Sequence, residues 1–131
     1  MGVNLGLPVS GVDRFIAAPP SAAWELLVDL AAWPRWGPSV RRAALLDGAT
    51  ELGLGTRGEV RTAVGVTLPF VITEFDPGRR WSWTVAGVPA TGHQVTAAPG
   101  GCLVRFEVPW WATAYLPVCS AALGRIDTLL R

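Results

Sequence analysis

The stretch TGHQVTA, residues 91–97, contains the only histidine of this 131-residue chain. An imidazole has an ordinary pKa near 6.5, so His93 is the first candidate for a group that gives or takes a proton at neutral pH. The one tyrosine, Tyr115, is the second candidate for proton transfer. His93 is catalytic if it faces a ligand cavity, or purely structural if it only satisfies a hydrogen bond, and the sequence leaves both readings open.

Several chemistries need residues that this chain lacks. It contains no lysine, which excludes mechanisms that depend on a lysine Schiff base. One histidine and two cysteines without a CxxC spacing exclude the common two-histidine and zinc-cysteine sites. No GxxxxGK phosphate loop is present, and the glycines of LGLGTRG do not fit a dinucleotide fingerprint. We therefore expect neither a metal nor a cofactor.

Charge and hydropathy narrow the class of partner. The net charge is +1 and the arginines are scattered, so no nucleic-acid partner is expected. No apolar run approaches the roughly 20 residues that span a bilayer, and the start MGVNLGLPVSG has neither a secretory nor a myristoylation pattern. A cytoplasmic protein is the expectation. Cys102 and Cys119 could pair in principle, but in that compartment reduced, buried thiols are expected.

The length suits one domain, residues 1–131. Residues 12–18 alternate and end at Pro19-Pro20, which predicts a strand followed by a helix. Helical spacing over residues 21–33 predicts that helix, with Trp33-Pro34 ending it and a short turn or second helix after it.

Short β-branched and aromatic segments separated by turn residues predict six further strands in an antiparallel meander. They span residues 40–46, 56–63, 66–75, 80–85, 91–98 and 102–108. Residues 110–131 return to helical spacing, with a kink or restart expected at Pro117 and about 22 Å of helix beyond it. Its predicted apolar face comprises Trp111, Tyr115, Val118, Cys119, Ala122, Ile126 and Leu129.

This order of elements, with the segments that fill it, resembles the START-like (SRPBCC) superfamily, which includes the birch-pollen-allergen type and the polyketide cyclase/dehydrase and lipid-transport proteins. The matching segments are APPSAAWELLVDLAAWPRW, GPSV, LGLGTRGEV, EFDPGRRWSW and PGGCLVRFEV, and they cover nearly the whole chain. The resemblance implies an α+β helix-grip fold, in which a seven-stranded antiparallel sheet curls around a long C-terminal helix. One or two short helices are implied between strands 1 and 2.

The resemblance also implies a cavity between the sheet and the helix that takes an apolar or aromatic molecule. Some relatives cyclise or dehydrate polyketides without a cofactor, and others only bind or carry a hydrophobic, lipid-like ligand. A fold alone does not choose between these roles. The enzyme and the carrier therefore both remain hypotheses, and we expect a cavity of roughly 300 to 1,000 Å³ for either.

Strand alternation predicts which side chains line that cavity. Phe106 lies on the strand face that must meet the helix, and the same rule turns His93, Trp81 and Trp83 inward. Across from the sheet, the candidate ligand contacts on the last helix are Trp110, Trp111 and Cys119, and Tyr115 is the candidate there for moving a proton. Packing in the core is the alternative role for Trp83, Trp110, Trp111 and Tyr115.

Other aromatic and charged residues have simpler readings. Trp24, Trp33 and Trp36 are predicted to fill core volume. Arg61 shares a strand face with Arg57 and Glu59, which indicates either a solvated ladder of charges or an inward Arg61 that holds an enolate or carboxylate.

Overall fold

Seven strands form one antiparallel sheet in the computed structural model of the chain, which describes residues 9–131. The predicted absence of a signal segment was based on residues 1–11, and residues 1–8 of that stretch lie outside the described residues. The strands are β1 (Val9–Ile16), β2 (Val40–Leu45), β3 (Arg57–Thr62), β4 (Thr67–Asp76), β5 (Arg80–Val85), β6 (Val88–Ala98) and β7 (Gly101–Pro109).

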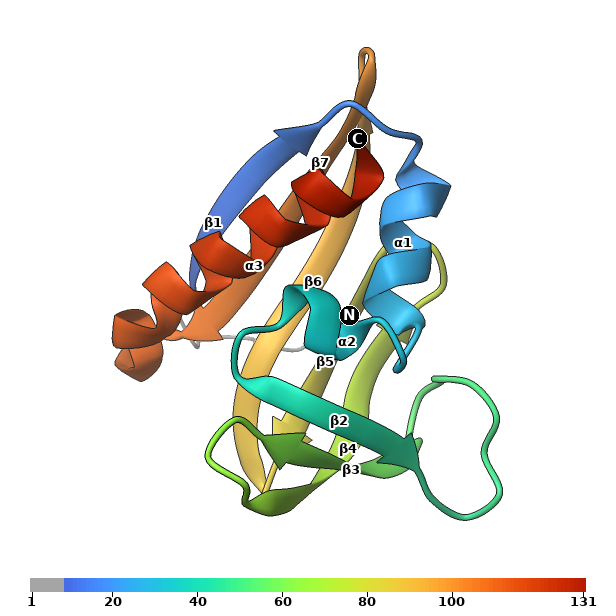
Figure 1. Ribbon diagram of the computed structural model, residues 1–131, viewed down its shortest axis with the longest axis vertical. Coiled ribbons are helices and arrows are strands. Elements are labelled where there is room, and N and C mark those ends of the chain that lie inside the picture. The colour runs from blue at the N-terminus through green and yellow to red at the C-terminus, as the bar shows by residue number, and fades with distance from the viewer. Residues whose placement is uncertain (1–8) are drawn as a thin grey trace.

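The strand order is β1-β7-β6-β5-β4-β3-β2, so β2 to β7 form the predicted meander and β1 pairs with β7. Strands β1 and β2 consequently lie at opposite edges of the sheet. The chain crosses between these edges through two short helices, α1 (Pro20–Val28) and α2 (Trp33–Trp36) (Figure 1).

Tight turns join the strands where the sequence predicts them. Gly78 and Gly100 each follow a proline and have φ of +81° and +82°, the left-handed value that a type II turn requires at that position. A third turn, at Ala86 and Gly87, was not predicted. Both residues have positive φ, +52° and +78°, and a residue with a side chain, such as Ala86, rarely adopts that conformation. This two-residue hairpin turn lets β6 begin at Val88, three residues earlier than expected.

The predicted first helix is wrong in its extent. It ends at Val28, because Asp29 takes an extended conformation and its side chain accepts a hydrogen bond from the backbone N–H of Ala31. Pro34 does not end a helix but lies in the first turn of α2, where a missing N–H costs nothing.

The C-terminal segment restarts at Pro117, as predicted. Residues 110–131 comprise a 3-10 helix, η1 (Trp110–Tyr115), and a 15-residue α-helix, α3 (Leu116–Leu130), with Pro117 in the first turn of α3. The α3 helix packs against β1 and β7 and also contacts α1 and α2. Its buried residues are Cys119, Ala122, Leu123 and Ile126.

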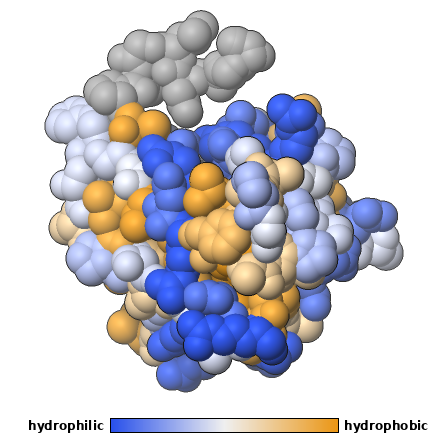
Figure 2. All heavy atoms as spheres, turned by 90° about the horizontal axis from the view of Figure 1, so that it is seen from above, coloured by the Kyte–Doolittle hydropathy of each residue, from blue (hydrophilic) through white to orange (hydrophobic). Residues whose placement is uncertain are grey.

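The curled seven-stranded sheet with a long helix against it is the helix-grip fold, as expected (Figure 1). Seen from above, apolar side chains gather in patches separated by a band of hydrophilic ones, so this face carries no continuous apolar surface (Figure 2). Within residues 9–131, no helix is both long enough and apolar enough to cross a membrane.

Candidate functional site

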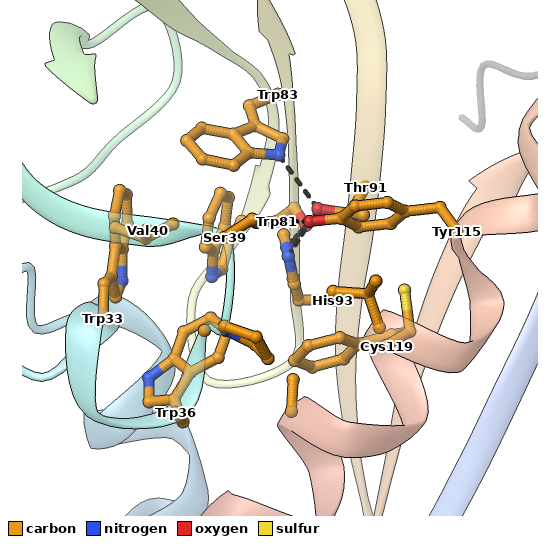
Figure 3. Close-up of a pocket in the computed structure, with 15 residues that line it drawn as sticks. Trp33, Trp36, Ser39, Val40, Trp81, Trp83, Thr91, His93, Tyr115 and Cys119 are labelled. Carbon is orange, nitrogen blue, oxygen red and sulfur yellow. Dashed lines mark hydrogen bonds between the residues drawn. The ribbon is translucent and has the colours of Figure 1, made fainter. Parts of the chain in front are cut away.

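A small cavity lies between the sheet and the C-terminal segment, with α2 closing its side (Figure 3). Its volume is about 50 Å³, so the predicted range of 300 to 1,000 Å³ is wrong. The cause is that large aromatic side chains fill most of the space that the backbone leaves. The lining residues are Trp33, Trp36, Gly37, Pro38, Ser39, Val40, Trp81, Trp83, Thr91, His93, Phe106, Tyr115, Val118, Cys119 and Ala122.

Three rings form a stack along one wall. The indoles of Trp33 and Trp81 lie nearly parallel, with centroids 5.4 Å apart, and the His93 ring lies 4.0 Å beyond Trp81 (Figure 3). Trp83 meets the Trp81 ring edge-on at 5.4 Å. The wall therefore presents aromatic faces and edges, which suit a planar apolar molecule.

Helix α2 brings two tryptophans to the cavity, of which Trp33 belongs to the ring stack. Trp33 and Trp36 are buried, as their predicted packing role requires, and they also line the cavity. Their indole N–H groups donate to the backbone oxygens of Leu27 and Leu26, at 2.9 and 2.8 Å. Carbonyls in the last turn of a helix have no partner within it, so the two indoles stabilise the end of α1 while they hold α2 in place.

His93 points inward, as alternation predicts, and only 2% of its surface is exposed. Its Nδ1 lies 3.2 Å from the carbonyl oxygen of Trp81, and its Nε2 lies 2.8 Å from the hydroxyl of Thr91. The Thr91 hydroxyl also accepts a hydrogen bond from the Trp83 indole N–H at 3.0 Å. Both imidazole nitrogens are thus engaged.

These partners determine which nitrogen carries the proton. A carbonyl oxygen only accepts, so Nδ1 donates to Trp81, and Nε2 accepts from the Thr91 hydroxyl. Burial lowers the pKa of His93 from 6.5 to about 3, with a smaller contribution from the charge of Arg80, against the carbonyl hydrogen bond that raises it. His93 is therefore neutral at pH 7 and is a weak base there.

Tyr115 approaches the cavity from η1. Its hydroxyl forms a short hydrogen bond with the hydroxyl of Ser39, which lies between α2 and β2 (Figure 3). Burial raises the pKa of Tyr115, and the bond to Ser39 offsets part of that rise. The pair joins two segments that border the cavity and places two hydroxyl groups at its wall.

The predicted contacts Phe106 and Cys119 both line the cavity. Burial raises the pKa of the Cys119 thiol to about 11, so it is a small apolar wall group rather than a nucleophile at pH 7. Cys102 is also buried, and no disulfide joins the two cysteines.

Trp110 and Trp111 do not line this cavity. They are 58% and 52% exposed and border a separate groove of about 360 Å³, together with Glu74, Arg80 and Glu107. The apolar face predicted for residues 110–131 is interrupted, because Ala112, with φ −115° and ψ 26°, does not have a helical conformation.

Arg61 also lies away from the cavity. It is exposed together with Arg57 and Glu59, while the alternating residues Gly58 and Val60 are buried. Of the two alternatives for Arg61, the structure therefore has the solvent-exposed ladder of charges. The cavity lining within residues 9–131 contains no charged side chain.

Two polar wall residues were not predicted. Thr91 lies two positions before His93, so the alternation that turns His93 inward also indicates Thr91. Ser39 gave no comparable signal, because its role depends on meeting Tyr115, 76 positions away. Within the described part of the chain, no three His, Cys, Asp or Glu residues are grouped so as to hold a metal ion.

A helix-grip fold over an aromatic-lined cavity defines a protein of the START-like superfamily. A sequence profile described as "Polyketide cyclase / dehydrase and lipid transport" matches residues 11–129, and the chain belongs to this family. No match was found among curated proteins.

Solved structures of bacterial proteins share the fold. MLL2253 from Mesorhizobium loti has a TM-score of 0.75 at 16% identity, covering 94% of this chain and 96% of that one. XoxI from Bacillus cereus has a TM-score of 0.74 at 15% identity, covering 95% and 96%. CV1439 from Chromobacterium violaceum has a TM-score of 0.64 at 20% identity, covering 93% and 96%. Identities this low show the fold alone.

Proposed function

We propose that the protein binds one small apolar or aromatic molecule in the cavity between the sheet and the C-terminal segment. The observation that carries this proposal is the cavity wall, where four tryptophans, one phenylalanine, one tyrosine and aliphatic groups surround a few paired polar atoms. Apolar walls with few oriented polar groups are typical of small-molecule sites. Membership of the family supports the same role.

The cavity must widen to admit a ring-sized molecule, because about 50 Å³ is below the usual size of such sites. The hydrogen bond between Ser39 and Tyr115 joins the segments on either side of the cavity. Tyr115 is also partly exposed, so its movement costs less packing than that of the buried tryptophans. In this proposal, entry of the ligand separates Ser39 from Tyr115.

A cofactor-independent polyketide cyclase or dehydratase is the second candidate. The specific observation in its favour is the Ser39–Tyr115 hydroxyl pair at the wall, which can polarise a ligand carbonyl or hydroxyl. His93 supports catalysis less, because its pKa is about 3 and Thr91 occupies its Nε2. Binding without turnover, as in a carrier of a hydrophobic ligand, is therefore the role that the geometry supports better.

Tryptophan fluorescence tests the binding proposal. Titration with small aromatic compounds is expected to quench the emission saturably, because a bound ring lies against Trp81 and Trp83. The Ala122→Leu variant places a larger side chain in the cavity from α3 and is expected to weaken this binding at least tenfold. Ala121→Leu, at an exposed neighbouring position, is the matched control and is expected to bind like the unmodified protein.

Flat titrations across mono- and bicyclic aromatic compounds, or equal binding by the two leucine variants, would contradict the proposal. Mass spectrometry of a bound polyketide-like compound after incubation then separates the two candidates. A new product that forms with protein and does not form with the Tyr115→Phe variant supports catalysis, whereas unchanged compound supports binding alone.

A further inference from the structure

The indole nitrogen of Trp81 is buried and has no hydrogen-bond partner among residues 9–131. Trp81 is 1% exposed and lines the cavity, in the middle of the ring stack between Trp33 and His93 (Figure 3). Leaving such a donor unpaired is costly, and buried donors in proteins are almost always paired. The unpaired N–H therefore requires an explanation from its surroundings.

The other polar side-chain groups of the wall are paired. Trp83 donates to Thr91, Thr91 donates to His93, and His93 donates to the backbone oxygen of Trp81. The indoles of Trp33 and Trp36 donate to carbonyls of α1, and Ser39 is bonded to Tyr115. Trp81 is thus the exception in a wall whose polar groups are otherwise matched.

We infer that Trp81 is a specificity-determining residue, whose indole N–H donates to one acceptor oxygen, such as a ketone, on the bound molecule. This inference rests on the proposed ligand-binding function. It narrows the ligand class from any apolar compound to a mainly apolar molecule that packs against aromatic side chains and carries a carbonyl or similar hydrogen-bond acceptor.

The same wall selects against charged ligands. A carboxylate moved out of water needs a cation or several hydrogen bonds, and none of the lining residues in the described range 9–131 is charged. Arg80 directly precedes Trp81 on β5, but its charge is paired with Glu74 and Glu107. Burial keeps His93 neutral. The ligand oxygen that accepts the hydrogen bond from Trp81 is therefore uncharged. Free fatty acids and similar anions are expected to be poor ligands.

Calorimetry with indane, 1-indanone and indane-1-carboxylate tests this inference, because the first two differ only by the carbonyl group. We compare the ratio of the 1-indanone and indane affinities in the unmodified protein and in Trp81→Phe, which keeps an aromatic ring and removes the N–H. The ratio is expected to fall roughly three- to tenfold in the variant, the range of one net hydrogen bond. The carboxylate is expected to bind at least tenfold more weakly than the ketone.

Trp83→Phe is the matched control. It removes another indole N–H from the wall, but one that Thr91 already accepts. The smaller ring is expected to change the affinities for indane and 1-indanone by the same factor. The ratio should therefore stay as in the unmodified protein.

The outcomes separate this inference from the proposed function. If none of the compounds binds, the proposed function fails. If indane and 1-indanone bind with a ratio that Trp81→Phe leaves unchanged, binding stands and the role of Trp81 is overturned. Equal binding of the carboxylate and the ketone overturns the exclusion of anions.

A second measurement does not depend on the folding of a variant. In ¹⁵N-labelled unmodified protein, 1-indanone is expected to move one indole N–H resonance downfield, as a new hydrogen bond does, while indane leaves that resonance without such a shift. Identical shifts with both compounds would overturn the inference.

Discussion

His93 illustrates how burial changes what a titratable residue can do. Its two nitrogens are engaged by Trp81 and Thr91, and desolvation disfavours its charged form. The imidazole therefore stabilises the fold in its neutral form. Its protonation should be visible in the pH dependence of stability.

Acidification is expected to destabilise the protein through this one residue. The pKa of His93 is about 3 in the folded chain and 6.5 as an ordinary value, so between these values the unfolded state binds the extra proton. The stabilisation is complete above pH 6.5 and is lost as the pH falls below it. From pH 7 to pH 5, the free energy of unfolding should fall by about 2 kcal/mol, measured by urea denaturation.

The chain has a single histidine, so the control for this slope is direct. His93→Gln removes the titrating group and should make the free energy of unfolding nearly independent of pH between 7 and 5, at a lower overall value. An unchanged slope in this variant would show that another group is responsible.

Helix α2 is the element on which the cavity depends. It is only four residues long, so it cannot be stable by itself, and its two tryptophans hold it through α1. Trp36 also meets Phe106 and His93 edge-on, with ring centroids 5.6 and 6.3 Å away. The side chain thus connects α1, α2 and the sheet.

Replacing Trp36 by alanine should lower the free energy of unfolding by about 3 to 5 kcal/mol, because a buried ring is lost and a cavity remains. Trp36→Phe, which keeps an aromatic ring and loses the hydrogen bond to Leu26, should cost clearly less. Urea or thermal denaturation measures both. A loss below about 1 kcal/mol for the alanine variant, as at exposed positions, would refute the packing role.

Across the whole molecule, a polar network on the outer face of the sheet connects five strands. Arg80 on β5 pairs with Glu74 on β4, Gln94 on β6 and Glu107 on β7. Arg105 continues the network from Glu107 to Asp13 on β1. Burial by itself would raise the pKa of Glu107, but its hydrogen bonds to Arg105 and Arg80 outweigh burial and lower that pKa.

Arg80→Met should therefore cost about 1.5 to 3 kcal/mol of unfolding free energy, the value of hydrogen bonds to charged groups that are largely shielded from water. The Arg80 side chain is only 17% exposed, whereas that of Arg79, which pairs with Asp76, is 77% exposed. Arg79→Met is the matched control and should change stability by less than about 0.5 kcal/mol. Equal effects of the two variants in urea denaturation would argue against a stabilising network.

Local patterns were sufficient for much of the fold and for one wall of the site. Strand alternation turned His93, Trp81, Trp83 and Phe106 inward, because successive side chains on a strand point to opposite faces whatever packs against them. Proline and glycine at positions 77 and 78 predicted a turn through the backbone angles that those residues favour. The order of the segments, compared with a known superfamily, indicated how these elements assemble.

Other features were decided only by tertiary structure. The volume of the cavity, the pairing of Ser39 with Tyr115 and the exposure of Trp110 and Trp111 all depend on where distant segments meet. The N–H of Trp81, which has no partner in the described part of the chain, belongs to the same group, because the positions of distant groups decide whether it is paired. Periodicity reports the direction of a side chain along its own strand or helix, whereas volume and hydrogen bonding depend on the distances between elements, which no local pattern contains.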